Sequence, residues 1–347
     1  MALPIDFITR TRALLGEEFD RLEAALSADV PVSIRINPMK GTPAPKAGAP
    51  VAWCESGFYL PERLSFTFDP LFHAGAYYVQ EASSMFLEQA IKAYVKEPVR
   101  CLDLCAAPGG KSTHLASLLP DGSLLVSNEV IRSRSYVLAE NIAKWGHPDT
   151  IVINNDPEEI GEALPHLFDV IVTDVPCSGE GMFRKEPVAR TQHCEALVKQ
   201  CAALGAEILD CAAAVLAPGG QLVYSTCTFA PEEDEGQVAA FLQRHPEFEL
   251  ADALGNVDYT FGSEGEANRT GGLPLDVSKV RRIWPCQGGE GHFMARLVKN
   301  GTPRALPAEG EYTPEEQLWL AAAEAAGKKA KGKGGKPAKA ADARSAR

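Results

Sequence analysis

Two cysteines each follow a predicted buried strand, in segments whose residue types suit covalent chemistry. Cys177 lies in DVPCSG (174–179), and Cys227 lies in YSTCT (224–228). If both strands belong to one parallel sheet, their carboxyl ends open onto the crevice where such sheets bind ligands. Two thiols would then face one pocket, and a thiolate is a strong nucleophile. The alternative is that both are buried small residues, which is a common role for free cysteine.

A glycine-rich turn follows the first predicted strand. The segment CAAPGGKST (105–113) leads into a helix predicted to begin near His114. Small residues let the backbone approach a ligand there, and a helix N-terminus offers unpaired amide groups. The segment lacks the glycine spacing of dinucleotide oxidoreductases and of P-loops. It predicts a site for another nucleotide-like ligand, unless it is only a tight turn.

Acidic residues stand at the ends of the next three predicted strands. Glu129 ends the second strand, Asp156 the third and Asp174 the fourth. A carboxylate about 20 residues after such a turn can bind ribose hydroxyls. Each acid alone could equally cap a helix or form a turn. Together they predict an adenosine bound between strands one, two and three.

The elements that must position these residues alternate between strand and helix from residue 99 onward. This alternation predicts a parallel sheet with helices on both faces. The predicted strands cover residues 100–104, 123–128, 150–154, 168–173 and 221–225. A long helix is predicted over 189–216 and ends at APGG (217–220). Two apolar runs, 282–284 and 292–298, predict a terminal antiparallel hairpin. The predicted fold class is therefore α/β, with a mostly parallel Rossmann-like sheet.

The N-terminal part of the sequence has a different pattern. Apolar spacing predicts a helix over 5–28, ended by Pro31, and alternation predicts a strand over 32–37. A segment rich in Pro, Gly and Ala (38–50) is predicted to be a loop. These elements predict a small, separate α+β lobe.

The predicted division is an N-terminal lobe over 1–95, a larger domain over 96–302 and a final segment over 303–347. The final segment holds one predicted helix (313–326) and a Lys-rich tail. Residues 328–347 carry a net charge of +7, whereas the rest of the chain carries −19. The tail has almost no apolar residue larger than alanine and is predicted to be disordered. It could hold RNA phosphates, or it could be a linker or a solubilising end.

Composition and cysteine usage indicate a globular protein in a reducing compartment. The 347 residues, 45% of them apolar, are enough for two domains. No membrane span or signal peptide is evident, so we expect a cytoplasmic protein. The nine cysteines are an odd number, and the nearest pair, Cys101 and Cys105, has no His or Cys cluster beside it to complete a zinc site. We expect free thiols, no metal and a monomer.

Three motifs in order resemble the Sun family of RNA (cytosine-5) methyltransferases. They are LDLCAAPGGK (102–111), DVPCSGEG (174–181) and STCT (225–228), the last followed by the acidic EEDE (232–235). The N-terminal segments SIRINP (33–38) and AGAYYVQE (74–81) make the chain most similar to the bacterial ribosomal members of the RsmF/YebU type. The resemblance covers roughly residues 5–299. It implies that the lobe over 1–95 binds RNA and that the domain over 96–302 is the methyltransferase catalytic domain.

The resemblance implies a Rossmann-like methyltransferase sheet with S-adenosylmethionine as the methyl donor. The implied cofactor-binding residues are Cys105, Ala106, Ala107, Pro108, Gly109, Gly110, Lys111, Glu129, Asp156 and Asp174. It also implies that Cys227 is the nucleophile and that Cys177 assists release. The implied substrate is a cytosine in RNA, most directly in 16S ribosomal RNA.

These roles suit the chemistry of cytosine. A thiolate that adds to carbon 6 turns carbon 5 into an enamine-like nucleophile able to attack a methyl sulfonium. Asp174 can hydrogen-bond the base at ring nitrogen 3 and at the amine. Cys227 needs nearby positive charge or amide donors to form a thiolate, and Lys185 is a candidate source.

The base must be unstacked to react, so RNA loops and junctions are the expected substrates. Arg35, Tyr77 and Tyr78 are candidates for contacting RNA, although the tyrosines could equally belong to the core. His73 is expected to be a structural or surface histidine. Val175 stands where alanine is usual in the family, which adds bulk beside the pocket.

The end of the chain also departs from the family. Ribosomal members of this type usually continue into a C-terminal RNA-binding domain, so we expect a shortened form or an incomplete product. The resemblance leaves a transfer RNA substrate open. An RNA-binding assembly factor with incidental methylation is the alternative from another class. DNA is disfavoured, since DNA cytosine methyltransferases generally use the Pro-Cys thiol as nucleophile and lack the second one.

Overall fold

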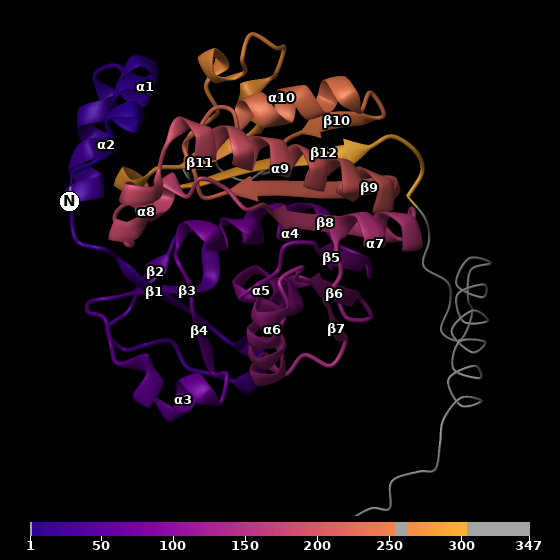
Figure 1. Cartoon of the computed structure of the whole chain (residues 1–347). Helices are drawn as coiled ribbons and strands as arrows, with labels where there is room; N and C mark the ends of the chain where they lie inside the picture. The colour runs from indigo at the N-terminus through magenta and orange to yellow at the C-terminus, as the bar shows by residue number, and fades with distance from the viewer. Residues whose placement is uncertain (1, 254–261, 304–347) are drawn as a thin grey trace, which may run out of the picture. The chain divides into compact units, whose positions relative to one another are not determined.

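Two β-sheets organise the protein (Figure 1). The computed structural model describes residues 2–253 and 262–303, which belong to one unit, Met1–Arg304. The predicted C-terminal helix and Lys-rich tail lie outside the described residues. No helix within the two described ranges is long and apolar enough to cross a membrane.

The larger sheet has eight strands, seven of them in the order β10-β12-β9-β8-β5-β6-β7, with β11 paired to β12. The strands are β5 (Arg100–Asp103), β6 (Leu124–Asn128), β7 (Thr150–Ile153), β8 (Phe168–Asp174), β9 (Leu216–Thr226), β10 (Phe248–Ala251), β11 (Arg281–Ile283) and β12 (His292–Lys299). β5 to β9 run parallel, whereas β12 is antiparallel to β9, β10 and β11. Strand order reverses between β5 and β8, the point at which such sheets bind ligands. The predicted α/β fold class with its terminal antiparallel hairpin is confirmed.

Four of the five predicted parallel strands agree with the structure to within one residue at each end. β9 begins earlier than the predicted residue 221, because Leu216 already pairs with Phe168 of β8 before the register shifts. Gly219, at a φ of 74°, supports this irregular stretch. β10 was not predicted, because a four-residue strand carries too little alternation to stand out.

Two predicted helices are each divided in the structure. The helix expected over 5–28 is α1 (Ile5–Leu15) and α2 (Glu18–Ser27), interrupted at Gly16, whose φ is 57°. The helix expected over 189–216 is α8 (Pro187–Gln192) and α9 (Glu195–Val215). His193 and Cys194 between them have extended backbone, and the His193 ring contacts the buried Glu180 carboxylate at 2.8 Å. Both breaks were missed because apolar spacing continues across them.

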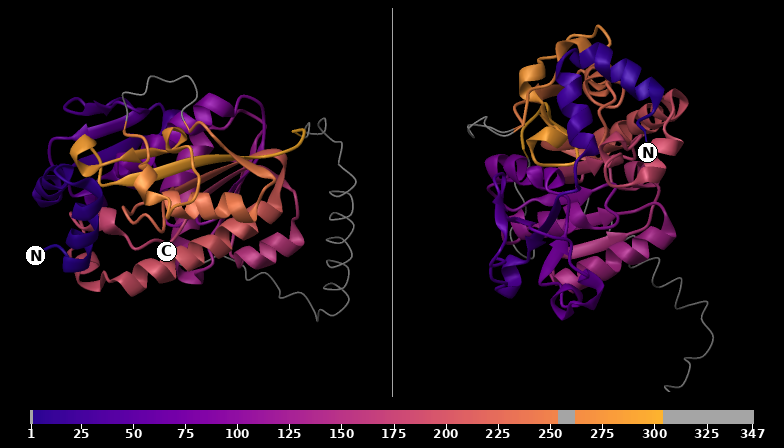
Figure 2. Two further views of the ribbon diagram at one scale, coloured as in Figure 1. Left: turned by 90° about the horizontal axis from the view of Figure 1, so that it is seen from above. Right: turned by 90° about the vertical axis from the view of Figure 1, so that its left-hand side faces the viewer.

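Helices cover both faces of the larger sheet (Figure 2). The remaining helices of this part are α4 (Leu87–Tyr94), α5 (Gly110–Leu118), α6 (Arg132–Trp145), α7 (Pro157–Ala163) and α10 (Glu235–Arg244). Alternate strand residues enter different cores: Leu102 packs with the side chains of α7, α9 and α10, whereas Cys101 packs with those of α4 and α5. α5 begins at Gly110, four residues before the predicted start.

The smaller sheet is antiparallel, with the order β2-β3-β1-β4. Its strands are β1 (Val32–Ile36), β2 (Ala49–Val51), β3 (Cys54–Leu60) and β4 (Tyr77–Val79), and α3 (Pro70–His73) lies before β4. α1 and α2 pack their phenylalanines against Phe183, Phe229 and Trp284 of the later chain. The N-terminal segment is thus in contact with the rest of the unit, and a domain boundary at residue 95 stays a prediction.

Arg35 on β1 joins the smaller sheet to the first turn of α5. Its guanidinium is fully buried and donates to Thr113 Oγ1 at 2.5 Å, to the Gly110 carbonyl at 3.2 Å and to Gln80 Oε1 at 2.8 Å. The Trp145 ring lies 4.4 Å from it. The interpretation of Arg35 as an RNA contact is therefore wrong, because the side chain does not reach the surface.

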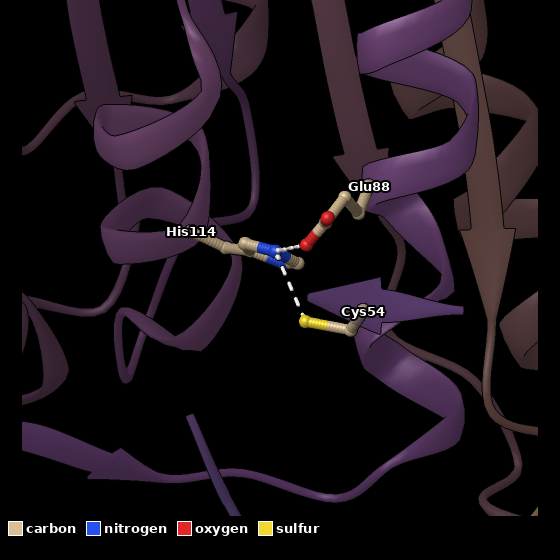
Figure 3. A group of neighbouring side chains, drawn as sticks. All are labelled: Cys54, Glu88 and His114. Atoms are coloured by element: carbon tan, nitrogen blue, oxygen red, sulfur yellow. Dashed lines mark hydrogen bonds and ion pairs between the residues drawn. The ribbon is translucent and has the colours of Figure 1, made fainter. Parts of the chain in front are cut away.

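A second buried cluster ties the same helix to its neighbours (Figure 3). His114 Nε2 on α5 lies 3.0 Å from Glu88 Oε2 on α4 and 3.7 Å from Cys54 Sγ on β3. Burial lowers the pKa of His114 to about 4, so the neutral ring donates its single N–H to Glu88. A metal at Nε2 would leave Nδ1–H buried without the hydrogen-bond partner that a liganding imidazole uses, and Lys92 already neutralises Glu88. The cluster therefore connects α5 to α4 and to β3 of the smaller sheet through side-chain hydrogen bonds.

Replacing Arg35 with lysine should destabilise the protein by ~2–4 kcal/mol, because an ammonium cannot keep all the guanidinium contacts and remains a buried charge. Chemical unfolding measures the loss. Arg21→Lys, at an exposed ion pair on α2, is the matched control and should change stability by less than about 0.5 kcal/mol. Equal stability of the two variants would contradict this role of Arg35.

Candidate active site

Cys177 and Cys227 lie at the ends of neighbouring parallel strands. Asp174 at the end of β8 pairs in register with Ser225 near the end of β9, and each cysteine follows within three residues. The two sulfur atoms are 3.3 Å apart, and both cysteines line one pocket. The prediction that two thiols face a single pocket is confirmed.

The acidic segment 232–235, which follows Cys227 in the chain, forms hydrogen bonds with both cysteine loops, the segments that contain Cys177 and Cys227. Glu233 Oε2 accepts a hydrogen bond from the Ser178 amide at 2.8 Å, and Asp234 Oδ1 accepts one from Thr226 Oγ1 at 2.6 Å. The hydroxyls of Ser178 and Thr228 meet at 2.8 Å and connect the loops directly. Each cysteine is thus flanked by residues in a buried hydrogen-bond network, which fixes the sulfur positions.

Arg282 on β11 compensates part of this buried negative charge. Its guanidinium contacts Asp234 Oδ2 at 2.8 Å and also bonds both carboxylate oxygens of Glu235. All three side chains are almost completely buried, so removal of one would leave the others uncompensated. The terminal hairpin therefore stabilises the acidic segment that holds the cysteine loops in place.

The two sulfurs are close enough to form a hydrogen bond. The hydrogen bond to Cys227, followed by burial, raises the pKa of Cys177 well above its ordinary value. Cys177 therefore keeps its proton at neutral pH and can donate its S–H to the Cys227 sulfur.

Asp174 is held between Lys111 and Ser225. Lys111 Nζ lies 2.7 Å from Asp174 Oδ2, and Ser225 Oγ donates to Asp174 Oδ1 at 2.8 Å. Burial alone would raise the pKa of Asp174, but Lys111, His292 and these hydrogen bonds lower it below its ordinary value. Asp174 is consequently a carboxylate at neutral pH, with one third of its side chain exposed to the pockets.

A pocket of about 1140 Å³ opens at the switch point of the sheet. Five of the predicted cofactor residues line it, namely Cys105, Ala107, Glu129, Asp156 and Asp174. The volume suits a nucleoside-sized cofactor, and apolar walls with a few acids are typical of such sites. The residues present therefore fit an adenosine-containing cofactor, with Glu129 as the candidate ribose ligand.

The other predicted cofactor residues occupy different positions. Ala106, Pro108, Gly110 and Lys111 line a smaller neighbouring pocket. Gly109 lines neither pocket; it caps α5 with a φ of 113°, a conformation that favours glycine. Asp156 also caps α7 by accepting from the Glu158 amide at 3.0 Å, so the helix-cap role is real.

The smaller pocket, about 270 Å³, has one wall from the N-terminal segment. Tyr78 and Gln80 lie on that wall, and Lys111 and His292 line the same pocket. Asp174 and Cys227 line both pockets, so a ligand in one adjoins a ligand in the other at these residues. This volume suits a single unstacked base.

Glu290 and His292, which precede and begin β12, also line the smaller pocket, and neither is among the predicted site residues. The hairpin was predicted from its apolar pattern, which says nothing about a pocket. The available signal was the run GGEG (288–291). Gly291 packs so closely that a Cβ would lie 2.5 Å from the Phe229 ring, which shows how tightly this turn approaches the site.

Of Lys185, Tyr77 and Tyr78, only Tyr78 lines a pocket. Lys185 is exposed and lines neither pocket, so its role beside Cys227 stays a prediction without a contact to support it. Tyr77 belongs to the core of the smaller sheet and donates to Asp69 at 2.7 Å, whereas Tyr78 lines the smaller pocket. His73 is a surface residue, as predicted.

Fold and site together define a Rossmann-like methyltransferase. Residues 91–298 match the family model of the 16S rRNA methyltransferase RsmB/F, and residues 3–82 match the N-terminal domain of 16S rRNA methyltransferase RsmF. The chain belongs to the RsmB/F family. Family membership and the fit of the larger pocket support S-adenosylmethionine as its cofactor.

Curated relatives agree with this assignment. The chain is 34% identical to ribosomal RNA small subunit methyltransferase F of Cronobacter sakazakii over 325 residues, which cover 89% of this chain and 65% of the relative. The same protein of Klebsiella pneumoniae is 34% identical over 88% of this chain and 66% of its own length. The chain thus spans about two thirds of the length of these relatives.

Solved structures share the fold. A methyltransferase homologue from Pyrococcus horikoshii has a TM-score of 0.69 and 29% identity, covering 84% of this chain and 93% of that one. The structure of NSun6 from Pyrococcus horikoshii with SFG has a TM-score of 0.68 and 19% identity. The match covers 86% of this chain and 99% of the NSun6 chain. The predicted methyltransferase fold is confirmed.

Glu233→Gln should stabilise the protein at pH 8 and have less effect at pH 5. Burial raises the pKa of Glu233 to about 8, whereas an unfolded glutamate titrates near about 4.3. The fold favours the protonated acid, so this contribution to stability is complete below the unfolded pKa and is lost as the pH rises toward 8. Glutamine keeps a carbonyl acceptor for Ser178 and carries no charge.

Thermal unfolding at both pH values measures this effect. Glu232→Gln, at the exposed neighbouring residue, is the control and should give a Tm difference from wild type that does not change with pH. A Glu233→Gln gain of the same size at pH 5 and pH 8 would refute the shifted titration.

Proposed function

We propose that the protein transfers a methyl group from S-adenosylmethionine to carbon 5 of a cytosine in RNA, most directly 16S ribosomal RNA. The observation that carries the proposal is the pair of sulfurs 3.3 Å apart where the two pockets adjoin, with Asp174 beside them. The curated relatives are named as ribosomal RNA small subunit methyltransferases, which supports the ribosomal substrate.

Cys227 acts as the nucleophile in this proposal. Its sulfur bonds to carbon 6 of the base, and the electron pair of the carbon 5–carbon 6 double bond makes carbon 5 nucleophilic. The bound cofactor supplies the methyl group that carbon 5 takes. The proton on carbon 5 then leaves to a base, the sulfur–carbon 6 bond breaks, and the double bond reforms as the thiolate departs.

Cys177 has a supporting role at both ends of this sequence. Its S–H is placed to donate a hydrogen bond to the Cys227 sulfur before attack. Its sulfur lies 3.3 Å from that of Cys227, and after methyl transfer it assists the release of the RNA.

Asp174 and Lys111 act on the polar edge of the base. The Asp174 carboxylate accepts a hydrogen bond from the amine of cytosine, and Lys111 offsets its charge at 2.7 Å. Uracil presents a carbonyl oxygen at the same position and would face the carboxylate unfavourably. Tyr78, on the N-terminal wall, offers a ring on which an unstacked base can stack.

The test is transfer of labelled methyl groups to separate 16S, 23S and transfer RNA pools. Wild type should label an RNA pool, and Cys227→Ala should lose transfer because no adduct can form. Cys177→Ala should accumulate a covalent RNA–protein adduct on denaturing gels. Cys201→Ala, at a cysteine that lines neither pocket, is the matched control and should behave as wild type.

The outcomes separate the alternatives. Labelling of transfer RNA alone would replace the ribosomal substrate, and no labelling of any pool would refute the enzymatic proposal. An adduct in Cys227→Ala and none in Cys177→Ala would exchange the roles of the two thiols.

A further inference from the structure

We propose that His292 binds the unstacked cytosine by donating a hydrogen bond from Nε2 to the carbonyl oxygen on carbon 2 of the base. The inference rests on the proposed function, since it names a residue that recognises the same substrate. It concerns a side chain outside all three sequence motifs.

His292 is the first residue of β12 and is fixed in the sheet by pairing with Ile283 of β11. The residue is 3% exposed, yet it lines the smaller pocket together with Lys111, Asp174 and Cys227. Its position is therefore set by backbone pairing, and it forms part of the lining of the pocket where a base would lie.

The Nε2 atom of His292 is buried without a hydrogen-bond partner among the described residues. Buried polar atoms in folded proteins are nearly always paired, because an unpaired one loses the hydrogen bonds that it made to water. A ligand in the smaller pocket would supply the partner. The unpaired atom is thus independent evidence for a polar ligand group on this side of the pocket.

The charge state of His292 suits a neutral hydrogen-bond donor. Burial, reinforced by the nearby Lys111 ammonium, lowers the pKa of His292 to about 3. The ring is neutral at pH 7 and carries one N–H. It can therefore donate a hydrogen bond without adding a second cation beside Lys111 or exchanging a proton with the Cys227 thiolate.

The geometry of cytosine indicates which base atom His292 meets. The amine and the carbonyl oxygen stand at opposite ends of the polar edge, with ring nitrogen 3 between them. Asp174 takes the amine in the proposed function, which leaves the carbonyl oxygen for a donor. When Cys227 attacks carbon 6, negative charge develops on that oxygen, so a fixed donor there stabilises the transition state more than the ground state.

The first experiment compares His292→Phe with His292→Gln in single-turnover transfer to 16S ribosomal RNA at saturating cofactor. Phenylalanine removes the donor and should slow transfer by about 10²–10³-fold, the usual effect of losing one donor to a developing oxyanion. Glutamine carries an N–H at a similar reach and should stay within about tenfold of wild type. His245→Gln, at a histidine that lines neither pocket, should match wild type.

Two measurements exclude a merely structural effect of His292→Phe. Calorimetric affinity for S-adenosylhomocysteine and the thermal midpoint should both stay close to wild type. In a Cys177→Ala background, His292→Phe should also slow the appearance of the covalent adduct, because the donor acts on the attack step.

The second experiment changes the base atom instead of the protein. RNA transcribed with 2-thiocytidine replaces the carbonyl oxygen by sulfur, a weaker acceptor. Wild type should lose rate on this RNA relative to normal RNA, whereas His292→Phe should show little further loss, because the interaction is already absent. Comparing the two ratios cancels any general effect of sulfur on RNA folding.

The results distinguish the inference from the proposed function. Equal rates for wild type and His292→Phe, or an equal loss by both on 2-thiocytidine RNA, would overturn the role of His292 while methyl transfer stands. A wild-type protein that transfers no methyl group to RNA would overturn both.

Discussion

The parallel pairing of β8 with β9 is the constraint on which the whole site depends. In-register pairing of Asp174 with Ser225 places the two following loops side by side, and the sulfurs end 3.3 Å apart although 50 residues separate them in the chain. A shift by one residue would turn every side chain of the strand to the opposite face. Chemistry that needs two thiols and a carboxylate at one point therefore rests on backbone hydrogen bonds.

Buried carboxylates keep the loops in place beyond the ends of the strands. Glu233 and Asp234 bind polar groups of the two cysteine segments, and Arg282 compensates their neighbour Glu235. Burying such groups is costly unless they are hydrogen-bonded and paired. Here the interactions hold the loops rigidly, and rigid placement of reacting groups reduces the entropy lost when a substrate is oriented for reaction.

The N-terminal sheet contacts the glycine-rich turn and also lines the smaller pocket. Arg35 and the Glu88–His114 contact hold the helix that follows the glycine-rich turn, and Gln80 both accepts a hydrogen bond from Arg35 and lines the smaller pocket. Because one sheet supports the glycine-rich turn and also walls the smaller pocket, ligands bound at the two places would be positioned by the same framework. Arg35 seemed suited to RNA from its charge, but its contacts are internal.

Local sequence patterns were sufficient to predict the parallel strands, the glycine-rich turn and the segments that carry Cys177 and Cys227. These features can be predicted locally, since apolar runs, glycine-rich turns and short motifs are each formed by residues adjacent in the chain. Two helix predictions were wrong, because the apolar spacing continues across the helix breaks at Gly16 and His193.

Tertiary structure alone decided which distant groups meet. The Lys111–Asp174 contact joins two motifs, the Arg282 contacts join the hairpin to the acidic segment, and His292 enters the pocket from a strand about 65 residues after Cys227. Burial and long-range charge set the states of these side chains, and neither is encoded by the residues adjacent to them in the chain.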